Sequence, residues 1–157
     1  MKQLNKYIVE RLHINKDTGN HDHHYNYHPK TYNELKELVD KLIIERGNDA
    51  DLNDIDTSKI TDMNSLFDRS EFNGDISAWD VSNVKDMSYM FMQSKFNGDI
   101  SNWDVSNVET MDSMFYRSEF TGENGDISKW DVSNAKNNMY YMFSKSPLEK
   151  NQPKWSK

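Results

Sequence analysis

Cysteine is absent from the 157 residues, and proline and glycine are scarce, with three and six copies. Without cysteine the chain forms no disulfide, no thiolate metal site and no thiol nucleophile. No apolar run approaches the roughly 18 residues that a membrane-spanning helix needs, so we expect no membrane span. The first residues contain neither a long apolar segment nor a small-residue cleavage site. We therefore expect no signal peptide and a cytoplasmic or virion-associated protein.

Positive charge is also scarce, but only in one part of the chain. Residues 1–50 carry 8 basic and 8 acidic side chains, whereas residues 51–157 carry 11 basic and 18 acidic ones. The whole net charge of −7 therefore belongs to the second part. Because a surface with this surplus repels phosphate, nucleic acid is a poor candidate partner.

The chain does contain a sequence repeat, and all four tryptophans occupy one phase of it. Trp79, Trp103, Trp130 and Trp155 follow one another at nearly equal intervals. The sequence Phe-Asn-Gly-Asp-Ile-Ser-x-Trp-Asp-Val-Ser-Asn-Val occurs at residues 72–84 and again at residues 96–108. A self-similar period of this length predicts a repeat architecture, in which each unit buries its apolar side against its neighbours.

Two patterns alternate within each repeat. Gly-Asp-Ile-Ser follows a turn and predicts a short strand that stacks on its equivalents. Ser82 then precedes apolar residues at spacings of three and four, which predicts about two helical turns capped by this serine. The equivalent cap positions are Ser58, Ser106 and Ser133. The predicted fold class is an α/β repeat, a leucine-rich-repeat-like solenoid of about four 24-residue strand-turn-helix coils with an N-terminal helical cap.

We predict three segments along the chain. Residues 1–26 comprise an amphipathic helix over residues 2–13 and a His-rich linker. Residues 27–50 form a helical cap, in which Thr31 begins a helix and Gly47 ends it. Residues 51–157 form the repeats. The first helix is expected to place four apolar residues on one face: Leu4, Tyr7, Ile8 and Leu12.

The repeat unit also carries a family resemblance. The pattern Asp-Ile-Ser-x-Trp-Asp-Val-Ser-Asn-Val-x-x-Met-x-x-Met-Phe resembles the BspA-like leucine-rich-repeat surface proteins, which are repeats of unknown function in mycoplasmas, gut anaerobes and their phages. Residues 27–35 and 54–58 are similar to the entry module of that family. The resemblance covers residues 27–157 and implies a leucine-rich-repeat-type solenoid that binds other macromolecules. Residues 4–12 resemble the starts of small bacteriophage proteins.

One polar cluster and one set of columns are candidates for metal binding. Four histidines and an aspartate lie close together in the sequence: His21, Asp22, His23, His24 and His28. They could hold Zn²⁺ or Ni²⁺, but their spacing matches no defined site, and we interpret the segment as a solvated loop. Aspartates recur in two columns: Asp75, Asp99 and Asp126, and Asp56, Asp80, Asp104 and Asp131. Calcium between the coils is one interpretation, and corners in which each carboxylate accepts from nearby backbone N–H groups are the favoured one.

No catalytic or cofactor-binding residue is assigned, because the repeat accounts for every recurring acid and serine. Gly74, Gly98 and Gly125 are interpreted as turn glycines, since no lysine or arginine recurs beside them to bind phosphate. The Met and aromatic residues that recur in phase, such as Met87, Met90 and Phe91, are expected to fill the core.

The predicted function is a non-enzymatic protein–protein interaction module. Positions that differ between repeats are the expected contacts, and the large side chains among them are Tyr89, Met92 and Tyr116. The alternative is a structural or accessory component of a phage particle or other assembly, docked through Leu4, Tyr7, Ile8 and Leu12. A third class is a metal-dependent protein built on the His21–His28 loop.

Overall fold

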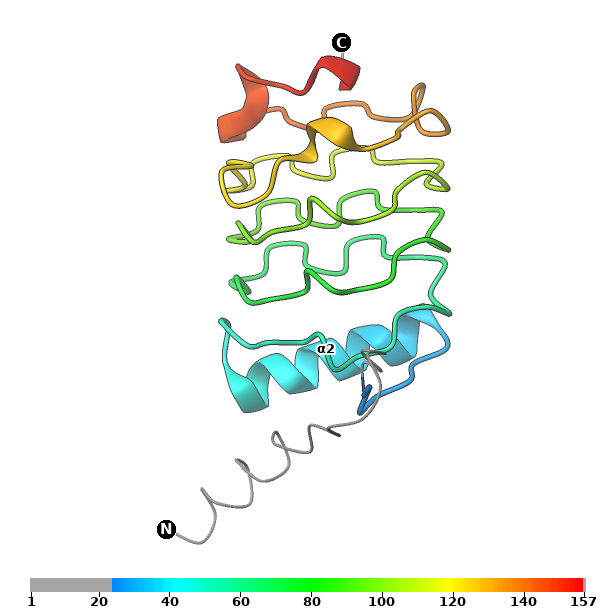
Figure 1. Ribbon diagram of the computed structural model, residues 1–157. Coiled ribbons are helices and arrows are strands. Elements are labelled where there is room, and N and C mark those ends of the chain that lie inside the picture. The colour runs from blue at the N-terminus through cyan, green and yellow to red at the C-terminus, as the bar shows by residue number, and fades with distance from the viewer. Residues whose placement is uncertain (1–23, 157) are drawn as a thin grey trace, which may run out of the picture.

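The computed structural model describes residues 24–156. Within this range one α-helix is present, together with three 3₁₀-helices and four isolated parallel β-bridges. The helices are α2 (Tyr32–Arg46), η1 (Ile127–Lys129), η2 (Pro147–Glu149) and η3 (Lys154–Ser156). Helix α2 lies at one end of the molecule, and the last residues lie at the other end (Figure 1).

Helix α2 begins and ends where the sequence predicts. The Thr31 hydroxyl accepts a hydrogen bond from the backbone N–H of Glu34 at 3.3 Å, which satisfies one of the free donors of the first turn. Gly47 has a φ of 94° and donates its N–H to the Ile43 carbonyl at 2.8 Å. The buried side of the helix consists of Leu35, Val39 and Leu42.

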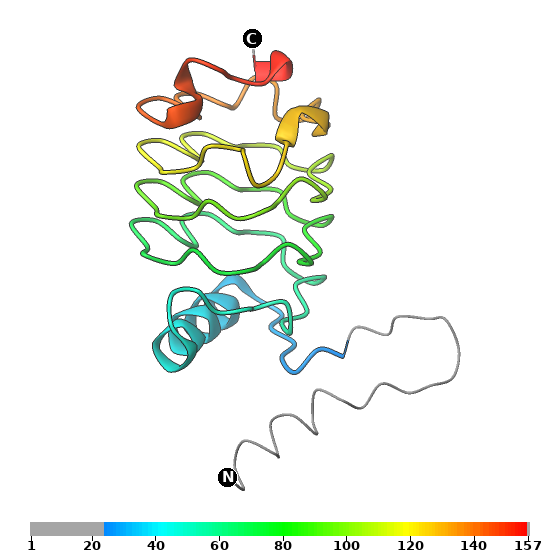
Figure 2. The ribbon, with the colours of Figure 1, turned by 60° about the vertical axis from the view of Figure 1, so that its left-hand side comes forward.

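The repeats stack on α2 as successive layers of the chain (Figures 1 and 2). Backbone N–H groups of one layer donate to carbonyls of the next, as from Phe67 to Met90 and from Phe91 to Met114, both at 2.9 Å. In the first two layers Met63 donates to Asp86, and in the last two Met111 donates to Asn138. The second donor and acceptor are separated by more residues of the sequence than the first. The layers therefore stay in register although their lengths differ.

The predicted α/β solenoid of strand-turn-helix coils is wrong, and the leucine-rich-repeat description is wrong with it. In residues 74–97 the chain instead forms consecutive short turns, each closed by an N–H that donates to a carbonyl three residues earlier. The donors of these turns are Trp79, Val84, Met90, Met92 and Ser94. Ser82 caps no helix, and both its N–H and its hydroxyl donate to Oδ1 of Asp80, at 3.0 and 2.6 Å. The predicted strand is reduced to isolated bridges such as Asp51–Asp75.

The turns do not merge into a helix because two positions in each layer have left-handed backbone. The first set is Ser65, Tyr89, Ser113 and Tyr141, and the second is Arg69, Gln93, Arg117 and Lys145, all with φ between 54° and 60°. An α-helix needs φ near −63° at every residue, so two left-handed residues four positions apart in each layer stop it. Successive turns still bring an apolar residue inward about every three positions, which produces the spacing that predicted a helix.

Aromatic side chains fill the space between the layers. Phe67, Phe91, Phe115 and Phe143 form one stacked column, with ring centroids 5.6, 5.6 and 5.7 Å apart. Phe72, Phe96 and Phe120 form a second, with centroids 6.3 and 6.4 Å apart. The columns contact each other, at 4.4 Å between Phe91 and Phe96. Such pairs contribute about 0.5–1.5 kcal/mol each beyond the area they bury, so the layers are fixed by ring stacking as well as by backbone bonds.

The repeated tryptophans serve the same stacking. The indole N–H of Trp79 donates to the Leu52 carbonyl at 2.9 Å, and that of Trp103 donates to the Ile76 carbonyl at 3.2 Å. Trp130 and Trp155 repeat the contact with Ile100 and Ile127. Three of the tryptophans fill the core and Trp155 packs against it partly buried, and each bonds a carbonyl of the preceding layer. This explains why the residue type recurs in phase.

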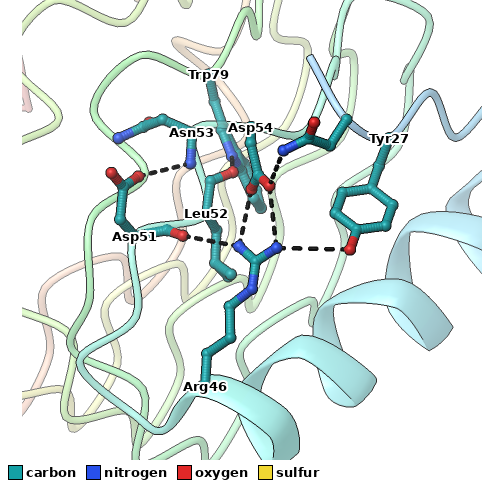
Figure 3. A network of polar contacts seen from close by, with 8 residues as sticks. Tyr27, Arg46, Asp51, Leu52, Asn53, Asp54 and Trp79 are labelled. Atoms are coloured by element: carbon teal, nitrogen blue, oxygen red, sulfur yellow. Dashed lines mark hydrogen bonds and ion pairs between the residues drawn. The ribbon is translucent and has the colours of Figure 1, made fainter. Parts of the chain in front are cut away.

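Arg46 joins the end of α2 to the first layer (Figure 3). Its guanidinium donates to both carboxylate oxygens of Asp54, at 2.9 and 3.0 Å, and to the Asp51 carbonyl at 3.1 Å. It also lies over the Tyr27 ring, 5.7 Å from the centroid. The side-chain hydrogen bond to Asp54 raises the pKa of Arg46 above its usual range. Because Asn26 also donates to Asp54, at 2.8 Å, this carboxylate fastens residues 26–27 and α2 to one layer.

We expect Arg46→Lys to lower the free energy of unfolding by about 1–2 kcal/mol, since lysine cannot make the bidentate contact. Urea unfolding followed by tryptophan fluorescence measures the change. Lys41→Ala is the control, because its pair with Glu45 is exposed, at 3.8 Å, and pairs of that kind contribute about 0–1 kcal/mol. Equal losses in the two variants would contradict the role given to Arg46.

A glycine and an alanine variant at one left-handed position distinguish a turn from a helix by which of the two is more stable. Ser113 has a φ of 55°, so Ser113→Gly should be more stable than Ser113→Ala by about 1 kcal/mol. In a helix the order is reversed by a similar amount. Urea unfolding of the two variants decides the matter, and a more stable alanine variant would refute the left-handed turn.

Candidate protein-binding face

The structure places Tyr89, Met92 and Tyr116 on adjoining layers. The N–H of Gln93 donates to the Tyr116 carbonyl at 2.8 Å, so Met92 and Tyr116 occupy neighbouring layers at equivalent positions. Tyr89 is 40% exposed, while Met92 and Tyr116 are half-buried. The three side chains predicted from the variation between repeats therefore lie on one side of the stack.

Two further tyrosines belong to this side and were missed from the sequence. Tyr140 and Tyr141 are 66% and 72% exposed. The N–H of Ser113 donates to the Tyr140 carbonyl at 2.8 Å, which places Tyr141 at the same layer position as Ser113 and Tyr89. One extra residue in the fourth repeat hides this equivalence, and aligning on Met142-Phe143 instead of on Trp130 recovers it. We call Tyr89, Met92, Tyr116, Tyr140 and Tyr141 the tyrosine face.

The left-handed backbone explains why these tyrosines are exposed. Tyr89 and Tyr141 have φ values of 59° and 56°, which is unusual for a bulky residue. The residues that follow Tyr89, Met90 and Phe91, are buried. The turn thus directs two successive side chains into the core and leaves the preceding one in solvent.

A basic column borders the tyrosine face. It consists of the second set of left-handed residues: Arg69, Gln93, Arg117 and Lys145. All four are exposed. The guanidinium carbon of Arg117 lies 5.3 Å from the centroid of the Tyr116 ring, and Nζ of Lys145 lies 5.9 Å from it. Tyrosines and cations therefore gather on this side of an acidic protein, beside Asp68 and Asp112.

The aspartate columns form corners, as the favoured interpretation predicts. Oδ1 of Asp75, Asp80, Asp99, Asp104, Asp126 and Asp131 each accepts from the backbone N–H two residues later. The side-chain and backbone donors of Ser106 lower the pKa of Asp104, and those of Ser133 lower the pKa of Asp131. The sequence Asp-x-Ser thus specifies a turn. Within residues 24–156, no three His, Asp or Glu side chains come together in an arrangement that holds a metal ion.

Two of the three corner glycines, Gly74 and Gly125, are required by the contact between layers, and an added Cβ on Gly98 would lie 2.8 Å from the Phe96 ring. A Cβ atom on Gly74 would lie 2.0 Å from the Ala50 carbonyl oxygen, and one on Gly125 would lie 2.3 Å from Oδ1 of Asp99. The hollow beside them, of about 560 Å³, is lined by Asn, Asp, Ser and Gly residues without a lysine or arginine. No basic group is therefore placed there to bind a phosphate.

The remaining predicted residues divide between described and undescribed parts of the chain. Leu4, Tyr7, Ile8, Leu12, His21 and His23 lie outside the described residues. His24 is exposed, and Nδ1 of His28 lies 3.1 Å from Oδ2 of Asp56. The longest helix among residues 24–156, α2, has 15 residues, and no helix there is long and apolar enough to cross a membrane.

Comparison with known proteins identifies the family. Residues 33–155 match the family described as "Mycoplasma protein of unknown function, DUF285". The match spans most of the chain, including α2 and all the layers, and the protein belongs to this family. No curated protein and no solved structure matches the chain.

The acid sensitivity of the fold should follow the aspartate corners. The pKa values of Asp104 and Asp131 are lower in the folded protein than in the unfolded chain, so the folded state binds fewer protons. Their contribution is present above the unfolded pKa of about 3.9 and is lost as pH falls through the folded values. Asparagine keeps the acceptor oxygen and does not titrate. We expect Asp104→Asn plus Asp131→Asn to retain most of the stability at pH 7 and to lose less of it below pH 4.

Urea unfolding between about pH 2 and 7 measures this difference. Glu123→Gln is the control, because the Glu123 carboxylate accepts no hydrogen bond from the residues that the structure describes. A double variant with the same acid-induced loss as the wild type would contradict the explanation.

Proposed function

We propose that this protein is a non-enzymatic protein-binding module and that the tyrosine face is its binding surface. The supporting observation is where exposed apolar side chains gather. Among residues 24–156, the exposed large apolar side chains are Ile44, Tyr89, Tyr140 and Tyr141. Three of these four lie at the same turn of the layers. Tyrosine and arginine dominate the binding energy of many protein interfaces, because they combine large apolar area with polar groups.

The architecture supports this role. Ring columns and backbone bonds hold the layers rigidly, so the exposed tyrosines need little ordering when a partner binds. The resemblance of the repeat sequence to BspA-like surface proteins supports a binding role of the same kind.

Removing the tyrosine hydroxyphenyl groups should abolish partner capture. Tyr89→Ser plus Tyr141→Ser introduces the residue that Ser65 and Ser113 already provide at this position with φ of 57° and 55°, so the layers should fold normally. We expect at least tenfold less partner in affinity capture from the native source. A tenfold loss corresponds to about 1.4 kcal/mol of binding free energy, which a pair of hot-spot residues supplies. Ile44→Ser is the control, since Ile44 is 85% exposed on α2 and outside the face.

The same capture tests the alternative of assembly through the N-terminal residues. A full-length variant with serine at four positions removes the expected apolar side of that segment: Leu4, Tyr7, Ile8 and Leu12. Under our proposal this variant captures the partner as the wild type does. Capture that depends on these four residues and not on Tyr89 and Tyr141 would favour the phage-particle or assembly role and would refute ours.

A further inference from the structure

Two of the three cations in the basic column form no ion pair with the residues that the structure describes, and the third is Arg69. Arg69 lies 3.9 Å from Oδ2 of its neighbour Asp68. Within the described residues, neither Arg117 nor Lys145 forms an ion pair, whereas other exposed lysines such as Lys85 and Lys95 pair with glutamates of the next layer. Exposed lysines such as Lys59 and Lys136 also form no ion pair with described residues, so what distinguishes Arg117 and Lys145 is that both lie beside one aromatic ring.

Tyr116 brings these two cations together. Arg117 extends from the third layer and Lys145 from the fourth, joined by the bond from the Arg117 N–H to the Ser144 carbonyl at 3.0 Å. The charged groups lie 5.3 and 5.9 Å from the centroid of the same ring. The ring attracts each cation but neutralises neither charge. Both charges therefore remain available to an anion that contacts the two groups.

We propose, on the basis of the protein-binding function above, that the partner presents an acidic segment whose carboxylates bind Arg117 and Lys145 beside Tyr116. The planar guanidinium matches a carboxylate with two parallel hydrogen bonds, and the lysine accepts a second carboxylate as a point charge. Tyr89 and Tyr141 then contact apolar side chains of the same segment. The proposal assigns the anion contact to the basic column and the apolar contact to the tyrosine face.

The charge around this surface favours a short protein segment over a long polyanion. Screening limits charge effects to about 8 Å at physiological ionic strength, so the cations act locally although the protein is acidic. A nucleic acid or a long sulfated glycan would extend beyond two cations over a protein whose net charge of −7 repels it. A few glutamates or aspartates on a protein fit within the basic column.

Peptide binding by the full chain tests the proposal. The probe is a fluorescein-labelled ten-residue oligoglutamate, followed by fluorescence anisotropy, with oligolysine of equal length and a heparin decasaccharide for comparison. We expect oligoglutamate to bind and to weaken as salt rises. Arg117→Gln plus Lys145→Gln should weaken it at least tenfold. Lys59→Gln plus Lys129→Gln changes the net charge equally outside the column and should weaken it less than twofold.

The variants are matched to the fold. Gln93 occupies the equivalent position with a φ of 55°, so glutamine is already accepted there, and equal urea midpoints for both variants check this. Absence of oligoglutamate binding up to about 1 mM, or an equal loss in the control, overturns the proposal. Tighter binding of heparin than of oligoglutamate also overturns it, because the occupant would then be a different polyanion.

The failure of this inference is distinguishable from failure of the binding function. If Tyr89→Ser plus Tyr141→Ser removes partner capture and Arg117→Gln plus Lys145→Gln does not, the binding function stands and the acidic-segment inference falls. If neither pair affects capture, the function assigned to this face falls as well.

Discussion

The structure depends on one constraint, which is that the backbone groups left unpaired by the turns of each layer must bond to a neighbouring layer. Beyond α2 and the short 3₁₀-helices, the described chain has no regular element to satisfy its N–H and carbonyl groups. Leaving them unpaired in a buried layer would cost far more than a small domain's stability. The bonds from each layer to the next satisfy them, and the aspartate and tryptophan side chains satisfy others. Stacking in register is therefore a requirement of the backbone, and the side chains follow it.

That constraint explains which features the sequence could reveal. The phase of the repeat identified the tryptophan and phenylalanine positions that are buried, and the capping residues identified helix α2. The apolar spacing could not distinguish helical turns from stacked β-turns, because both bring an apolar residue inward at similar intervals. The deciding residues, Tyr89 and Gln93, are left-handed without being glycine or asparagine, so their type gives no signal. The recurrence of Asp-x-Ser two or three times in each of the second to fourth repeats was the available sign of turns.

The candidate site could be predicted only in part from the sequence, for a related reason. Tyr89 and Tyr116 stood out because their positions vary while the core positions do not. Tyr141 was missed because an extra residue shifts the fourth repeat relative to Trp130, and alignment on Met142-Phe143 or the layer-to-layer hydrogen bonds restore its position. The basic column was missed because its members lie a whole repeat apart in the sequence and include a glutamine among the cations. Such surfaces are assembled by stacking and are not written in any local stretch of sequence.

The unequal lengths of the layers have a consequence for how this protein can change. The step from Met111 to Asn138 is longer than the step from Met63 to Asp86, yet the same ladders remain intact, since the additional residues lie in corners. Register is thus kept by hydrogen bonds and not by residue number. A gene duplication or loss of one whole repeat would join equivalent edges and preserve every column of the core. The protein could then lengthen or shorten its display of tyrosines and cations one layer at a time, with no change to the fold that carries them.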